Sequence, residues 1–330
     1  MSSPYDLLGI GNAIVDVLAS IDEQFISKHN MRKGAMTLVS QEEAERIYKA
    51  LPSPKTVAGG AVANSCVGAA MLGSRVAYIG KVKEDDVGNI FANDMQSLGV
   101  HFKTAKTGAG PSTARSMICV TPDGQRTMNT FLGACTGIEK SDIDEHLLAK
   151  SKIFFIEGYL WDVASVRPHL QLAAGLSHAG GNRVALTLSD AWLVDRYRDE
   201  IRRFVHDHVD ILFANESEII SFYQTGDLDE AISHMRRDCN LGVITRSDQG
   251  SLVVDRNNTI PIAAEKVNVV DTTGAGDLYA GGFLFGLAAG YPLERCGHIA
   301  AICAGEIISH IGARPQADLQ KLVQSKLALV

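Results

Sequence analysis

The sequence feature that most constrains this chain is the glycine-rich heptapeptide DTTGAGD at residues 271–277. The β-branched run at 266–270 before it is typical of a strand. The small apolar run at 278–289 after it is typical of a buried helix, and Gly290-Tyr291-Pro292 would end that helix. We therefore expect a strand, a tight turn and a helix in this order.

The turn of this heptapeptide predicts an anion-binding site. Gly274, Ala275 and Gly276 leave the first free N–H groups of the helix unshielded, and the positive end of the helix dipole adds to their attraction. Asp277 would lie in the first helical turn beside that anion. A carboxylate next to an anion hole suits deprotonation of an alcohol and transfer of a phosphoryl group. The alternative is that Asp277 only caps a core helix.

In this context the heptapeptide resembles the C-terminal signature of the ribokinase-like carbohydrate kinases, the family that includes ribokinase, fructokinase and adenosine kinase. The resemblance implies an ATP-dependent kinase in which Asp277 is the catalytic base and Gly274, Ala275 and Gly276 form the anion hole. It also implies a ribokinase-like three-layer α/β/α fold with a doubly wound sheet and a small β lid. From residue 151 onward the chain alternates strand-like and helix-like segments, as such a sheet requires.

The chain shows no internal repeat, low-complexity tract or linker, so we expect one kinase domain over residues 1–330. The lid is expected from segments at about 13–40 and 101–133, the second containing a hairpin around Pro122-Asp123-Gly124. Arg126 follows this turn, and the resemblance implies that it reaches the phosphates. An exposed strand arginine is an equally good interpretation.

Two residues near the N-terminus are candidates for binding the acceptor. Gly9-x-Gly11 invites a dinucleotide-binding interpretation, but the third glycine of that motif is missing and a strand-like run follows. Asp16 is a lone carboxylate in this apolar run. The resemblance implies that Asp16 grips the ribose hydroxyl groups and that Asn12 supports it; a strand-end position is the alternative.

A second signature lies in the segment at 58–73, where paired glycines precede a helix of small residues. Tight helix packing explains its Ala and Gly residues, but Asn64 on an apolar helix needs a polar partner. The resemblance implies that Gly59, Gly60 and Asn64 bind sugar hydroxyls. Ala61 stands where sugar-specific members often have lysine, which favours a nucleoside kinase.

Asn215 and Glu218 have the spacing of a helix capping box. The resemblance adds that this Asn-x-x-Glu motif organises Mg²⁺ and its waters near the phosphates, in keeping with the few direct ligands that Mg²⁺ takes. Several relatives also bind a monovalent cation, so K⁺ is possible beside Asp271 and Thr273.

The polar turn after the strand-like run at 242–245 has two interpretations. An ordinary hairpin would explain it. The resemblance implies that the turn holds ATP, through the residues Thr245, Ser247, Asp248 and Gly250.

Composition excludes several classes of function. The net charge of -7 and the lack of a basic run argue against a nucleic-acid partner. The sequence has no run of about 18 apolar residues, so we expect no transmembrane helix. No signal peptide is evident. The six scattered cysteines fit a reduced, cytoplasmic protein. His206 and His208 could bind a metal, but a solvated helix end is the better interpretation.

The predicted function is ATP-dependent phosphorylation of a nucleoside 5′-hydroxyl, with adenosine converted to AMP as the leading reaction. Inosine or guanosine, or a free sugar such as ribose or fructose, are alternatives in the same class, and a ligand-binding regulator is the alternative from another class. Tyr159 or Trp161 could contact a base, although aromatic residues in such a place more commonly belong to the core. The sequence leaves open whether the protein is a monomer or a homodimer.

Overall fold

The computed structural model describes residues 5–327. Its centre is a nine-stranded sheet. In spatial order the strands are β14 (Thr259–Ile262), β13 (Ser251–Asp255), β12 (Leu241–Thr245), β11 (Ile211–Asn215), β10 (Arg183–Thr187), β9 (Ser151–Glu157), β1 (Tyr5–Ile10), β5 (Val76–Ile79) and β6 (Val100–Phe102). The strands from β12 to β6 are parallel, and β13 and β14 form an antiparallel edge.

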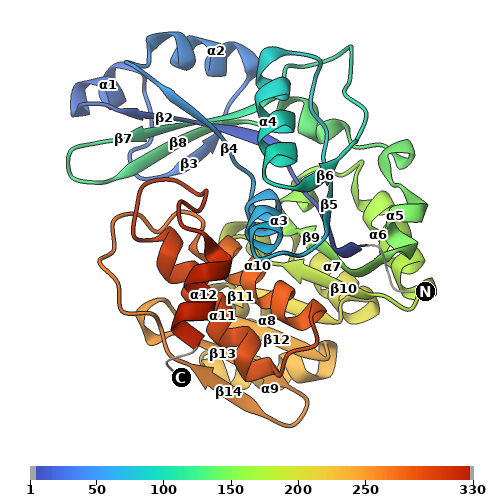
Figure 1. Cartoon of the computed structure of the whole chain (residues 1–330). Coiled ribbons are helices and arrows are strands. Elements are labelled where there is room, and N and C mark those ends of the chain that lie inside the picture. Colours follow the sequence, from blue (N-terminus) through green and yellow to red (C-terminus); the bar gives the residue numbers. More distant parts are fainter. Residues whose placement is uncertain (1–4, 328–330) are drawn as a thin grey trace.

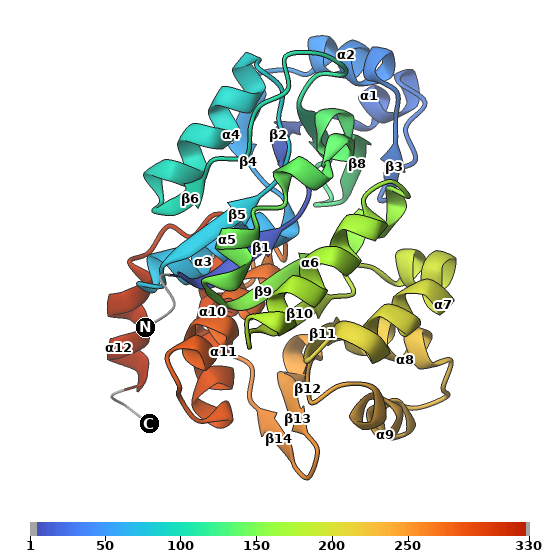
Figure 2. The ribbon, with the colours of Figure 1, turned by 90° about the vertical axis from the view of Figure 1, so that its right-hand side faces the viewer.

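Helices cover both faces of this sheet (Figure 2). One face carries α5 (Glu145–Ala149), α6 (Arg167–Ala179), α7 (Ala191–His208), α8 (Glu216–Tyr223) and α9 (Leu228–Asp238). The other carries α3 (Ala61–Met71), α4 (Asp86–Ser97), α10 (Ala275–Ala288) and α11 (Leu293–Ile307), with α12 (Leu319–Leu327) packed on α11. The strands of a parallel sheet are buried on both faces and read as continuous apolar runs. This is the three-layer, doubly wound fold that the sequence predicts.

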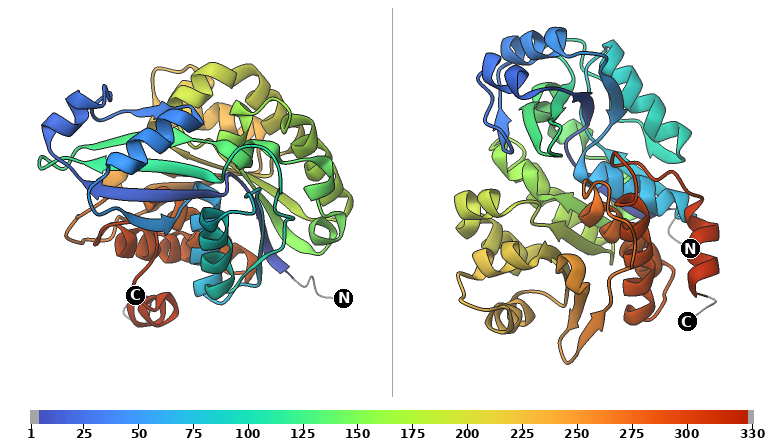
Figure 3. Two further views of the ribbon diagram at one scale, coloured as in Figure 1. Left: turned by 90° about the horizontal axis from the view of Figure 1, so that it is seen from above. Right: turned by 90° about the vertical axis from the view of Figure 1, so that its left-hand side faces the viewer.

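A second sheet of five strands lies above the large one (Figures 1 and 3). Its order is β3 (Met36–Leu38), β8 (Arg126–Phe131), β7 (Ala114–Val120), β2 (Ile14–Ser20) and β4 (Lys55–Ala58). Alternate residues such as Val17 and Met117 pack against α1 (Glu23–Lys28) and α2 (Gln41–Ala50). Residues of the opposite parity, including Ile118, line a cavity between the two sheets. Because successive side chains of a strand point to opposite faces, one face of this small sheet packs against its helices and the other lines the cavity.

The small sheet differs in its boundaries from the segments expected for a lid. β6 overlaps the start of the segment 101–133 but pairs in parallel with β5, so it belongs to the large sheet. β4 lies outside both expected segments and pairs with β2 in an antiparallel arrangement. Short strands flanked by polar residues carry little sequence signal about their partner, which explains both differences.

The strand expected at 266–270 is absent, which corrects that prediction. Residues 263–269 have no regular structure, and Val269 is 57% exposed. The N–H of Val270 donates to the carbonyl of Ile308 at the end of α11, so this segment pairs with a helix end and not with a strand.

Close packing of α3 against α10 places the two helices that carry candidate site residues side by side. A Cβ atom at Gly281 on α10 would collide with the carbonyl oxygen of Ser65 on α3. A Cβ atom at Gly68 on α3 would lie 2.6 Å from Cδ1 of Leu278. Both glycines therefore permit close approach of the two helices.

We predict that Gly281→Ala destabilises the protein by about 1–3 kcal/mol, because the added methyl group forces two packed backbones apart. Thermal unfolding measures the effect. Gly175→Ala is the matched control: it lies in α6 with no neighbour within 4 Å of its Cβ position. That change should raise stability slightly, by up to about 1 kcal/mol, through helix propensity. Equal unfolding temperatures for the two variants would contradict the close packing of α3 on α10.

Candidate active site

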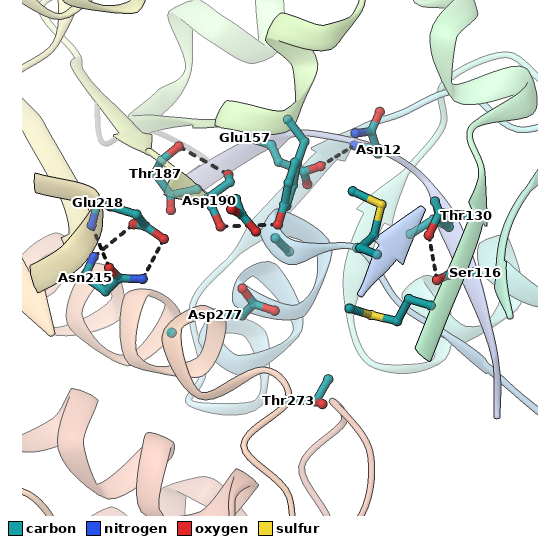
Figure 4. Close-up of a pocket in the computed structure, with 18 of the residues that line it drawn as sticks. Asn12, Ser116, Thr130, Glu157, Thr187, Asp190, Asn215, Glu218, Thr273 and Asp277 are labelled. Atoms are coloured by element: carbon teal, nitrogen blue, oxygen red, sulfur yellow. Dashed lines mark hydrogen bonds between the residues drawn. The ribbon is translucent and has the colours of Figure 1, made fainter. Parts of the chain in front are cut away.

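The cavity between the sheets has a volume of about 350 Å³ and lies at the carboxyl ends of the parallel strands. Five lining residues end or directly follow those strands. They are Asn12 after β1, Glu157 in β9, Thr187 in β10, Asn215 in β11 and Thr245 in β12. Figure 4 shows four of them, Asn12, Glu157, Thr187 and Asn215, in the same pocket as Asp277. The carboxyl edge of an open parallel sheet is where such folds bind ligands.

The cavity is strongly acidic. Among the described residues that line it, six are carboxylic acids and none is lysine, arginine or histidine. The acids are Asp16, Glu157, Asp162, Asp190, Glu218 and Asp277. Such a lining attracts cations and disfavours a bare anionic ligand.

Burial dominates the ionisation of this acidic group. It raises the pKa values of Asp16, Glu157 and Glu218 to about 7, and the nearby charge of Asp277 adds to the rise in each case. Burial also raises the pKa of Asp277 to about 6, although a hydrogen bond from Asn64 and the charge of a nearby arginine lower it. A carboxyl group poised near neutrality can accept a proton at physiological pH.

The turn before α10 has the geometry of an anion hole. Gly274 caps the helix in a left-handed conformation (φ +80°), and Asp277 is the third helical residue. The N–H groups of Gly274, Gly276 and Asp277 have no hydrogen-bond partner within residues 5–327. The N–H of Ala275 donates to the carbonyl of Thr272 at 3.2 Å. Ala275 therefore offers no free donor, which corrects that expectation.

Two of the acceptor-site candidates meet in the cavity with unused hydrogen-bonding capacity. Oδ1 of Asn12 is buried without a partner, and among the described residues no donor reaches the carboxylate of Asp16. Gly60 lines the cavity with them. A Cβ atom at Gly59 would collide with the carboxylate of Asp16, so this glycine makes room for it. Two free acceptors in a cavity suit the paired hydroxyl groups of a sugar.

Asn64 occupies a different place from the one expected. It is buried on α3 outside the cavity lining, and its Nδ2 donates to Oδ2 of Asp277 at 2.8 Å. Its Oδ1 accepts from Arg314. Both ends of this amide are thus used by protein partners, and the amide contacts Asp277 directly.

Glu157 is a site residue that the sequence analysis did not single out. Its two carboxylate oxygens accept the backbone N–H groups of Asn12 (3.3 Å) and Val62 (3.1 Å). Glu157 therefore joins the turn after β1 to the first turn of α3. The available signal was an acidic residue directly after the apolar run at 153–156.

Arg126 joins the small sheet to the turn before α10. Its guanidinium donates to Oγ1 of Thr273 and to Oδ2 of Asp271. Asp271 also accepts the N–H groups of Thr273 and Gly312, each at 2.9 Å. Burial raises the pKa of Asp271, but these donors and the charge of Arg126 outweigh it, and the pKa is lowered. With its oxygens already bonded and a guanidinium alongside, Asp271 does not fit a K⁺ site.

Asn215 and Glu218 form the expected capping box at the start of α8. The N–H of Glu218 donates to Oδ1 of Asn215 at 2.8 Å, and the N–H of Asn215 donates to Oε2 of Glu218 at 2.9 Å. The charge of Asp190 helps to raise the pKa of Glu218. Among the described residues no cluster of three or more His, Cys, Asp or Glu residues could hold a metal directly. One carboxylate and one amide oxygen at the edge of an acidic cavity fit Mg²⁺ that retains its waters.

Only one of the four residues expected to bind ATP lines the cavity in the structure. Thr245 lines the cavity. Ser247, Asp248 and Gly250 lie in the turn between β12 and β13 and do not line it. Gly250 adopts φ +81°, where a side chain would also collide with the carbonyl of Ile262. The backbone conformation alone therefore explains why position 250 is glycine. The role of this turn in binding ATP stays a prediction.

The two aromatic candidates also differ. Trp161 is 2% exposed and packs edge-on against Phe204, so it is a core residue. Tyr159 lines the cavity, as does Trp192, whose ring N–H is buried without a partner.

The comparisons with known proteins agree with this geometry. Residues 34–319 match the pfkB family carbohydrate kinases. The chain belongs to this family. It is therefore an ATP-dependent kinase, and the family expected from the heptapeptide is confirmed. No helix within residues 5–327 has the length and apolar character needed to span a bilayer.

Individual relatives resemble the chain over nearly its whole length. It is 28% identical to the adenosine kinase of Saccharomyces cerevisiae, covering 99% of this chain and all of that one. Among solved structures, the adenosine kinase of Sinorhizobium meliloti is 43% identical, with a TM-score of 0.92 over 98% of this chain and 99% of that one. A probable sugar kinase from Rhizobium etli CFN 42 is 39% identical, with a TM-score of 0.93 over the full length of both chains.

We predict that Asp277→Asn makes the ligand-free protein more stable at pH 8, by roughly 1–3 kcal/mol. A carboxyl group with a raised pKa keeps its proton in the folded state while the unfolded chain loses it. Its contribution to stability is therefore lost as the pH rises from about 4 through about 6. Asparagine removes this loss and can still accept from Asn64.

Urea unfolding of both proteins at pH 5 and pH 8 checks this prediction. The advantage of the variant should shrink at the lower pH. Asp207→Asn, at an exposed position near the end of α7, controls for the loss of a surface carboxylate. An Asp277→Asn protein less stable than wild type at pH 8 would show that Asp277 stabilises the fold.

Proposed function

We propose that this kinase transfers the γ-phosphoryl group of ATP to the 5′-hydroxyl of a nucleoside, with adenosine converted to AMP as the main reaction. The observation that carries the proposal is the position of Asp277. Its carboxylate lies in the cavity beside the unpartnered N–H groups of Gly276 and Asp277. A proton acceptor and a set of anion donors thus face one small volume, as phosphoryl transfer to an alcohol requires.

The small sheet supports a nucleoside over a free sugar. Its cavity face is largely apolar and presents five hydrophobic side chains. They are Ile14, Met36, Leu38, Ile118 and Met128. Ser116 and Thr130 add a pair of hydroxyl groups 2.9 Å apart. A flat apolar surface with a few polar atoms suits a purine base, whereas a free sugar would leave its hydroxyls against hydrocarbon.

In the proposed mechanism Asp16 and Asn12 hold the ribose hydroxyls and so direct the 5′-hydroxyl toward Asp277. The carboxylate of Asp277 takes the hydroxyl proton, and the oxygen attacks the γ-phosphorus in line with the bond to the β-phosphate. The N–H groups of Gly274 and Gly276, together with Arg126, hold the charge that develops on the phosphoryl oxygens.

Mg²⁺, when bound, would neutralise phosphate charge, and Asn215 and Glu218 are the residues that would hold it through water. We infer that ATP lies across Thr245 with Ser247, Asp248 and Gly250 in the adjoining turn. The small sheet would act as a lid that closes over the acceptor and excludes water.

We further propose that the enzyme works in the cytoplasm, since all six cysteines are free and buried. No K⁺ requirement is proposed, because Arg126 already neutralises Asp271. Whether one copy or two assemble does not enter the mechanism, since every residue in it comes from a single chain.

ADP release from Mg-ATP with a panel of acceptors tests the proposal. We expect turnover with adenosine at micromolar concentrations and at least ~10²-fold lower kcat/KM with ribose and fructose, since a site built for a base loses that binding with a free sugar. Turnover with inosine and guanosine, compared with that of adenosine, shows whether the site recognises adenine in particular or purines in general. Turnover only with a free sugar would refute the nucleoside assignment. Adenosine binding without ADP release, with no acceptor turned over, would indicate a ligand-binding regulator.

Asp277→Asn supplies the mechanistic control for the same assay. We expect at least a ~10²-fold loss of kcat, because a general base contributes about that much or more. Near wild-type turnover by the folded variant would refute the role of Asp277.

We also predict that Gly276→Ala preserves the fold and impairs turnover. A Cβ atom at Gly276 meets nothing within 4 Å, yet the residue lines the cavity. The methyl group would enter the space proposed for the transferring phosphoryl group. We expect an unfolding temperature at least equal to wild type and a loss of kcat of about tenfold or more, the usual effect of disturbing oxyanion contacts. Unchanged kinetics would place the phosphates elsewhere.

A further inference from the structure

Arg314 lies outside the cavity but contacts the residue that contacts the base. It follows α11, in the segment 312–315. Its Nε donates to Oδ2 of Asp94 on α4 at 3.0 Å, and its Nη1 donates to Oδ1 of Asn64 on α3. Its side chain is only 11% exposed. Asn64 in turn donates to Asp277. A continuous line of hydrogen bonds therefore runs from α4 to the cavity.

The donor chemistry of Arg314 fixes the direction of this line. A guanidinium group has donors and no acceptor, so only the oxygen of the Asn64 amide can face it. The NH₂ group of Asn64 must then face Asp277. A flipped amide would place N–H against N–H at Arg314 and oxygen against oxygen at Asp277. Arg314 thus sets which end of Asn64 the base meets.

The Asn64 contact also differentiates the two oxygens of the base. Oδ2 of Asp277 accepts from Asn64 at 2.8 Å, whereas no protein donor within residues 5–327 reaches Oδ1. Holding Oδ2 fixes the rotation of the carboxylate and leaves Oδ1 free for the acceptor hydroxyl. Small errors in such geometry are costly in rate.

We propose that Arg314 is a positioning residue, which orients Asn64 so that its amide holds the carboxylate of Asp277 in the reactive rotamer. The inference rests on the proposed role of Asp277 as base. Asn64, expected from the sequence to hold sugar hydroxyls, becomes the link between Arg314 and the base.

Arg314 has a second effect, which is electrostatic. The titratable and charged groups around Asp277 are Asp16 on β2, Glu157 on β9, Tyr159 after β9, Glu218 on α8 and Arg314. Arg314 is the cation whose charge lowers the pKa values of both Asp277 and Asp16, and the charge of Arg126 on β8 also lowers the pKa of Asp16. Loss of the guanidinium should therefore raise the pH below which turnover fails.

The test compares Arg314→Met and Arg314→Lys with wild type. For Arg314→Met we expect kcat to fall by ~10-fold or more, the scale of a misplaced catalytic group, with KM for ATP and adenosine nearly unchanged. The acid limb of the kcat profile should move to higher pH. Arg314→Lys keeps the charge and should restore the limb, while kcat recovers only in part because a single ammonium replaces the fork. If Arg314→Met keeps a normal kcat and the acid limb of its pH profile does not move, the proposal is overturned.

A double-mutant cycle with Asn64→Ala separates positioning from general damage. If Arg314 acts through Asn64, then at pH 8 Arg314→Met should cost little further kcat once Asn64 is alanine. Independent, multiplying losses would overturn the proposal. Should Arg314→Met fail to fold, the same cycle is run with Arg314→Lys.

Asp94→Asn is the matched control. It removes the outer ion pair of Arg314, in which the Asp94 side chain is 27% exposed, but leaves the Asn64 contact, so kcat should stay within about twofold of wild type. Failure of the inference is distinguishable from failure of the proposed function. Wild-type protein without turnover on any acceptor refutes the function, whereas an active wild type with an equally active Arg314→Met refutes only the role of Arg314.

Discussion

The structure depends on how buried carboxylates are held at the carboxyl edge of one sheet. Four of them have pKa values raised by burial to about 6 or 7. Charges removed from water are costly unless donors or cations replace the lost hydration. The cavity lining supplies no cationic side chain among the described residues. The fold around the cavity satisfies most of these groups with hydrogen-bond donors, and leaves one for the substrate.

Three of these four carboxylates receive hydrogen-bond donors, and each of the three fixes a junction in the fold. Glu157 ties β1 to α3 through two backbone N–H groups. Glu218 caps α8 with Asn215. Asp277 meets the amide of Asn64 where α3 packs on α10. Asp16 has no such donor within the described residues, in keeping with its proposed contact to the ribose hydroxyls. The same interactions that hold the acids thus assemble the proposed site.

The sequence predicted those features that depend on local pattern. The heptapeptide at 271–277 indicated the helix start, the anion hole and Asp277, because strand, turn and helix signals are read within about 20 residues. The features it missed depend on long-range contacts: Glu157 acts on residues 145 and 95 positions away, and Arg314 meets an asparagine 250 positions away. The β-branched run at 266–270 misled for a related reason. Its residues lie exposed beside the end of α11, and propensity carries no information about a missing strand partner.

The pH dependence of kcat/KM for adenosine, measured with saturating Mg-ATP from pH 5 to pH 9, tests the central claim most directly. If a buried Asp277 is the general base, the rate constant should fall on the acid side of an apparent pKa near 6, because protonation removes the acceptor of the hydroxyl proton. In Asp277→Asn, most of the activity should be lost, and the remaining activity should no longer fall with this apparent pKa. A wild-type profile that stays flat to pH 5 would show that no carboxylate in this cavity acts as the base.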